Sequence, residues 1–161
     1  TYDFIYGENR LTAIWPNAYL GGRVAGFNMA GVPTEYYGST AVNSLKYFGL
    51  AVASAGMVNP PDNSYEVISN RYDHTYKKVV LKDGLIVGMV FAGDIEKSGI
   101  VFSLMKERVE VERFKQALVS EDFGLASLPE EMWRARLGLP TSGIPSQAIL
   151  REEPKELVLG E

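Results

Sequence analysis

The feature of this 161-residue sequence that most restricts its fold is an Asp-Gly pair between two strand-like segments. Residues 75–82 alternate in polarity, whereas residues 85–92 are almost wholly apolar. A type I′ turn needs positive φ at both central residues, and Asp83-Gly84 is one of the pairs that favour it. We therefore expect a hairpin whose second strand is central in a sheet and covered on both sides, while the first strand keeps one face in water.

Further elements are predicted on both sides of this hairpin. Helices grouped after strands indicate an α+β fold, with an N-terminal helix, an antiparallel sheet of three or four strands, and then three short helices. Before the hairpin we predict an irregular segment at 1–12, a helix at 14–31, and strands at 43–55 (with a break at Gly49) and 65–69. After the hairpin we predict helices at 95–109, 111–118 and 128–137. Asp94 is expected to cap the helix at 95–109, and Ser127 the helix at 128–137.

The helix at 14–31 has an unusually small face. It starts near Pro16 and stops at Gly31, and a set of small residues recurs at helical spacing between them. This set consists of Ala18, Gly22, Ala25, Gly26 and Met29. Such a face lets another backbone approach closely, although each interior glycine costs the helix about 1 kcal/mol. We find no segment of this chain that explains the face, so we expect its partner to lie outside the chain.

Composition excludes several classes of protein. Lys and Arg total 16 and Asp and Glu total 20, which gives a net charge of −4 and no basic surface for nucleic acid. The chain contains no cysteine, which excludes a disulfide scaffold, a zinc-thiolate site and thiol redox chemistry within it. The longest apolar run, residues 85–93, is about half of a membrane span, and we see no secretory signal. A cytoplasmic protein without a membrane partner is the expectation.

Candidate catalytic residues are few. His74 is the only histidine, and Asp73 beside it could orient the imidazole. No serine or cysteine nucleophile motif accompanies it, so a solvated loop histidine is favoured over a catalytic one. The glycines do not form a G-x-G-x-x-G fingerprint or a P-loop. No catalytic residue and no metal ligand is therefore predicted.

Four segments carry a family resemblance. Pro16-x-Ala18-x-x-x-Gly22-Arg23 resembles the helix that follows the Gly-Asp segment in FAD-dependent pyridine nucleotide-disulfide oxidoreductases. Three later segments are similar to the C-terminal domain of that family, especially in its NADH oxidase and nitrite reductase-like branch. They are NSLKYFGL at 43–50, GDIEKSGI at 93–100 and LVSEDFGL at 118–125. The resemblance spans about residues 10–137 in the family's order.

The resemblance implies a domain organisation and a cofactor contact. Residues 1–38 would be the end of an FAD-binding domain, 39–138 a C-terminal interface or dimerisation domain, and 139–161 an extended tail. The helix N-terminus, with Ile14, Trp15 and Asn17, would face the flavin in the full-length enzyme only. A helix N-terminus favours negative charge, so it would stabilise a reduced, anionic flavin.

The resemblance also implies what the chain needs from outside. The full-length enzyme would use FAD and NAD(P)H, whereas the isolated chain is expected to hold no cofactor and to be inactive. Its partners would be the missing FAD and NAD domains, and a homo-oligomer is expected. Two alternatives stay open: a free-standing assembly module derived from such an enzyme, and a small-ligand enzyme that uses His74.

Overall fold

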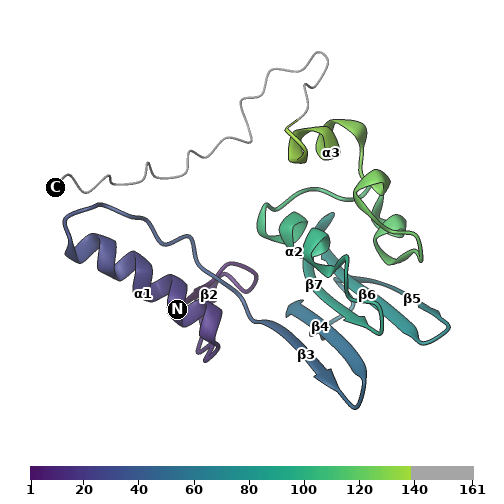
Figure 1. Cartoon of the computed structure of the whole chain (residues 1–161), viewed down its shortest axis with the longest axis horizontal. Coiled ribbons are helices and arrows are strands. Elements are labelled where there is room, and N and C mark those ends of the chain that lie inside the picture. The colour runs from purple at the N-terminus through teal and green to yellow at the C-terminus, as the bar shows by residue number, and fades with distance from the viewer. Residues whose placement is uncertain (139–161) are drawn as a thin grey trace. The chain divides into compact units, whose positions relative to one another are not determined.

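A computed structural model describes residues 1–138, and the extended tail predicted at 139–161 lies outside them. The described residues divide into two units, Thr1–Leu128 and a second unit that begins at Pro129. The larger unit contains the sheet, helices α1 and α2 and two 3₁₀ helices, and the smaller unit contributes helix α3, Glu130–Arg136 (Figure 1). In α3, the Nε atom of Arg134 donates to Glu130 at 2.7 Å, one turn apart on the helix.

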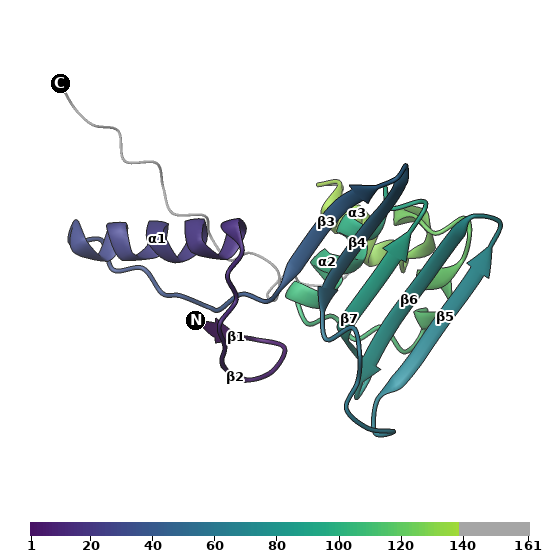
Figure 2. The ribbon, with the colours of Figure 1, turned by 90° about the horizontal axis from the view of Figure 1, so that it is seen from below.

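A five-stranded antiparallel sheet forms the centre of the larger unit. Its strand order is β3-β4-β7-β6-β5, and α2 (Ser98–Lys106) lies behind it in Figure 2. The α+β class is therefore confirmed, with more strands than the three or four predicted. The strands are β3 Val42–Tyr47, β4 Leu50–Gly56, β5 Glu66–Tyr72, β6 Thr75–Lys82 and β7 Leu85–Ala92.

Two hairpin turns explain this strand count. Asp83 and Gly84 have φ values of 51° and 74°, so the predicted type I′ turn joins β6 to β7. Phe48 and Gly49 have φ values of 47° and 86°, and they join β3 to β4 with Tyr47 opposite Leu50. The prediction of one strand at 43–55 with a break is thus wrong, because the chain reverses at Gly49.

The core lies between the sheet and α2. Phe91 on β7 and Val101 and Leu104 on α2 are fully buried. β7 is central, as predicted, but the prediction that β6 keeps one wet face is wrong, since Val80 is fully buried as well. The segment after β4 turns across that face, where Lys78 donates to the Val58 carbonyl at 2.6 Å.

The remaining corrections concern helix ends and short elements. The predicted helix at 111–118 is a 3₁₀ helix, η1 (Lys115–Val119), and a second one, η2, covers Leu125–Ser127. Neither predicted cap is formed: Asp94 accepts from the Glu96 N–H in a turn before α2, and Ser127 Oγ accepts from the Gly124 N–H. The first twelve residues, predicted as irregular, contain a short antiparallel pair, β1 (Tyr2–Asp3) and β2 (Glu8–Asn9).

Candidate functional site

Helix α1, Trp15–Met29, makes few contacts with the rest of its unit. Its boundaries agree with the predicted helix, with Pro16 in the first turn and Gly31 at φ 79° after its end. Asn17 is the one buried residue of the helix. Ile14, the N-cap, makes no side-chain cap, and the first turn contains no acidic residue. The N–H groups at this end are therefore free of a side-chain acceptor and keep their partial positive charge.

A buried polar cluster attaches the start of α1 to the sheet domain. Asn17 Nδ2 donates to the Thr40 carbonyl at 3.1 Å, and Thr40 Oγ1 donates to Asp3 Oδ2 at 3.0 Å. The other Asp3 oxygen accepts from the Ile5 N–H at 2.9 Å. Asn17, Thr40 and Asp3 are each at most 5% exposed. Because buried polar groups are costly unless they are paired, this cluster fixes where α1 begins relative to β1 and β3.

The three residues predicted to face a flavin occupy different environments. Trp15 is 81% exposed, Ile14 is half-buried, and Asn17 is buried. The side-chain nitrogen of Asn17 is committed to Thr40, so this residue positions the helix, while Trp15 and the free N–H groups are available to a ligand.

The small face of α1 has no neighbour within the part of the chain that the structure describes. A Cβ atom built on Gly21, Gly22 or Gly26 would have nothing within 4 Å outside the local helix backbone. Met29, on the same face, is 83% exposed. Within residues 1–138 this face is therefore open to solvent.

Removing the anchor should release α1 without unfolding the sheet. In Asn17→Ala the Thr40 carbonyl loses its buried partner, at a cost of about 1–3 kcal/mol that is confined to the helix attachment. Hydrogen exchange followed by mass spectrometry should show faster exchange in α1 and unchanged protection in β6 and β7. Gly26→Ala, which adds a methyl group in open space, serves as the control and should slow exchange in α1. Equal loss of protection in helix and sheet would contradict this account.

No enclosed catalytic site surrounds His74. Its side chain is 96% exposed in the turn between β5 and β6, with Asp73 Oδ1 at 3.7 Å from Nε2. A pocket of about 160 Å³ lies elsewhere, between Ile5 of the N-terminal segment and the β6–β7 turn. Among residues 1–138 there is no group of three or more His, Cys, Asp or Glu placed to hold a metal ion. None of the helices described has the length and apolar character needed to cross a membrane.

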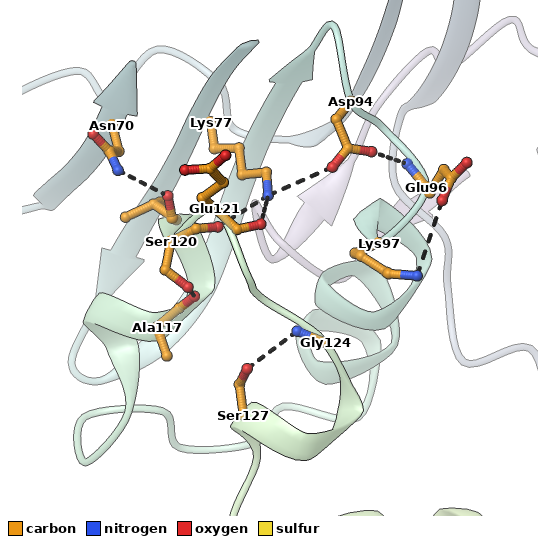
Figure 3. A network of polar contacts seen from close by, with 11 residues as sticks. Asn70, Lys77, Asp94, Glu96, Lys97, Ala117, Ser120, Glu121, Gly124 and Ser127 are labelled. Atoms are coloured by element: carbon orange, nitrogen blue, oxygen red, sulfur yellow. Dashed lines mark hydrogen bonds and ion pairs between the residues drawn. The ribbon is translucent and has the colours of Figure 1, made fainter. Parts of the chain in front are cut away.

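The sequence reasoning missed a buried lysine. Lys77 on β6 is fully buried, and its Nζ atom donates to the carbonyls of Ser120 at 3.0 Å and Glu121 at 3.4 Å (Figure 3). Asp94 Oδ2 lies 3.9 Å away, and the Phe91 ring centroid 5.7 Å away. The alternation of β6 places Lys77 on the same face as Val79 and Leu81, and this shared apolar face is the sequence signal that could have predicted its burial. The ammonium group holds the connector after η1 against the sheet.

Comparisons with known proteins define the class. Residues 42–109, from β3 to just beyond α2, match the rubredoxin NAD+ reductase C-terminal domain family. The NAD-dependent persulfide reductase from A. fulgidus has the same fold, with a TM-score of 0.60 and 19% identity over 77% of this chain and 26% of its own. The sheet and α2 are therefore similar to the C-terminal domain of rubredoxin NAD+ reductase, which confirms the resemblance to the pyridine nucleotide-disulfide oxidoreductase family over this part of the chain.

Two curated relatives are much longer than this chain. Subunit epsilon of the NADH-dependent phenylglyoxylate dehydrogenase of Aromatoleum evansii is 26% identical over 137 residues, which cover 81% of this chain and 32% of the relative. The NAD(P)H nitrite reductase of Bacillus subtilis (strain 168) is 32% identical over 95 residues, which cover 58% of this chain and 12% of the relative. The chain thus spans about a third or less of the length of these relatives.

Proposed function

We propose that this chain is the C-terminal interface domain of an FAD-dependent NAD(P)H oxidoreductase, and that α1 forms one wall of the flavin site when the dinucleotide-binding domains are present. The observation that supports this most is the packing of α1. Asn17 is the one buried residue of this helix, and its glycine face is open. We infer that the helix packs against a domain beyond residues 1–138.

The proposed roles of the site residues follow from the chemistry of the helix N-terminus. The uncapped N–H groups after Ile14 would face the flavin, and their partial positive charge favours the negative charge of a reduced flavin by about 0.3–1 kcal/mol. Trp15 would pack near the flavin ring, and Asn17 would hold the helix in register through Thr40. NAD(P)H would bind to a domain outside this chain. Alone, the chain would hold no flavin and transfer no electrons.

A chimera tests this function directly. This chain would replace the matching C-terminal residues of the A. evansii epsilon subunit, and bound FAD would be quantified from the absorbance of the released flavin. We expect stoichiometric FAD and NADH-dependent reduction of an artificial electron acceptor.

Gly26→Leu should weaken FAD retention roughly tenfold, equal to about 1.4 kcal/mol, because it fills the space needed by the neighbouring domain. Val24→Leu, two residues from Gly26 and therefore on the opposite side of α1, is the matched control and should leave FAD content unchanged.

The outcomes separate the two functions considered. A folded chimera that holds no FAD would contradict the flavin role and favour a free-standing assembly module. Titration of the isolated chain with FAD provides the complementary result, since tight stoichiometric binding there would mean that the chain builds a flavin site by itself.

Self-association of the isolated chain is also part of this proposal, because exposed apolar residues such as Trp15 and Met29 favour oligomers.

A further inference from the structure

Helix α1 has an unusual distribution of charge for an exposed element. Between Arg10 and Glu35 the sequence contains one charged residue, Arg23, although charged residues make up 22% of the chain. A helix in water normally carries charges on its outer face, and a helix without a charged face is normally buried. In residues 1–138, however, Asn17 is the one buried residue of α1. The helix therefore has the composition of an interior element, and the surface that covers it must accommodate a single cation.

Arg23 lies in the part of α1 that is open. At 3.6 residues per turn, it lies about 60° around the helix from Gly26 and about 120° from the anchor Asn17. A Cβ atom at position 26 would have nothing within 4 Å outside the local helix backbone, and Tyr19, one turn before Arg23, is 63% exposed. The Arg23 side chain is itself exposed. A domain that docks on the glycine face would therefore also reach Arg23.

The guanidinium group of Arg23 has no hydrogen-bond acceptor and no anionic partner among residues 1–138. Its Cζ atom lies 5.4 Å from the centroid of the Phe27 ring, one turn further along the helix. A ring at this distance supports the cation from one side but leaves its N–H donors without an acceptor. When a docking domain displaces water from these donors, the loss is costly unless an anion takes the place of the water.

We propose that Arg23 forms a bidentate ion pair with a carboxylate of the neighbouring dinucleotide-binding domain, and that this pair positions α1 against that domain. The inference rests on the proposed function, which supplies the domain. The two oxygens of a carboxylate match the planar fork of a guanidinium group. A second copy of this chain could not provide the carboxylate through the same surface, because residues 11–34 contain no Asp or Glu.

The place of Arg23 along the helix separates its role from that of the helix N-terminus. It lies about 13 Å along the axis from Ile14, whose end of the helix would face the flavin. The proposed partner of Arg23 is therefore in the protein surface that covers α1. Arg23 is a positioning residue, which acts on the flavin site through the helix.

The isolated chain provides the first test. Because Arg23 has no ionic partner among the described residues, Arg23→Met should leave the urea midpoint of unfolding unchanged. A clear fall of the midpoint would reveal a partner within the chain and would overturn the proposal.

Hydrogen exchange in the chimera tests the ion pair itself. Docking of the dinucleotide-binding domain should slow exchange in α1, and Arg23→Met should reverse this by about tenfold or more, because hydrogen bonds to charged groups contribute a factor of that size. Arg23→Lys keeps the charge and should retain part of the protection, whereas Arg23→Glu should lose all of it. Lys97→Glu makes the same change of charge at the start of α2, and as the control it should leave exchange in α1 unchanged. Wild-type exchange in Arg23→Glu would refute the ion pair.

The same measurement after removal of FAD identifies the source of the anion. With a carboxylate as the partner, the difference in exchange between wild type and Arg23→Met persists without FAD. If the difference disappears with FAD and returns when FAD is added, the partner is a phosphate of the cofactor and the proposed carboxylate pair is wrong. The FAD content of the wild-type chimera reports separately on the flavin wall. A chimera without FAD in which Arg23 still protects α1 would contradict the flavin role and support the ion pair.

Discussion

Gly88→Ala is expected to prevent the sheet domain from folding. A Cβ at position 88 would overlap the Met57 carbonyl oxygen and lie 2.5 Å from the Met57 carbonyl carbon. Both atoms belong to backbone that crosses the sheet, so neither can move as the end of a side chain could. We expect a loss of more than about 4 kcal/mol of unfolding free energy, seen as insoluble expression or as loss of the cooperative urea transition.

The matched control for this substitution is Gly26→Ala. A methyl group added at position 26 would have nothing within 4 Å outside the local helix, and alanine favours the helix by about 1 kcal/mol over glycine. The same chemical change should therefore abolish folding at one glycine and preserve it at the other. A Gly88→Ala protein with wild-type stability would mean that the segment after β4 does not lie across β7.

Lys77→Met should lower the unfolding free energy by about 2–3 kcal/mol. Methionine fills a similar volume, but the Ser120 carbonyl loses a charged donor at 3.0 Å, and hydrogen bonds to charged groups contribute about 1.5–3 kcal/mol. The connector that places Phe123 in the core should then exchange faster. The measurement is the urea midpoint at a constant slope of the transition.

A surface lysine supplies the comparison. Lys97 is half-exposed, and its nearest carboxylate, on Glu96, lies 4.0 Å away, so Lys97→Met should change stability by less than about 0.5 kcal/mol. If the two lysine variants unfolded at the same urea concentration, the connector would be held in place by its apolar side chains alone.

Local signals in the sequence predicted the elements that depend on local physics. Asp83-Gly84 and the stop at Gly31 each require a positive φ, and both elements are confirmed in the structure. Phe48-Gly49 is not a recognised turn pair, so β3 and β4 were merged into one strand. The burial of Val80 was missed because the segment that covers it comes from a distant part of the chain.

The candidate site was predictable only in outline. Proline, glycine and small residues define α1 from the sequence alone. The anchoring role of Asn17 depends on Thr40, 23 positions later, and the burial of Lys77 depends on Ser120, 43 positions later. Contacts at such separations are set by the tertiary fold, and no spacing rule within a helix or strand reveals them.

The sparse packing of α1 has a consequence for the strength of association. A helix of 15 residues is marginally stable in water on its own, and this one buries a single residue against its own domain. Part of the free energy gained when a neighbouring domain docks on it must therefore offset conformational entropy that the free chain retains. The measured affinity should consequently be weaker than the contact area suggests, and the heat-capacity change on docking should be larger than a rigid helix would give.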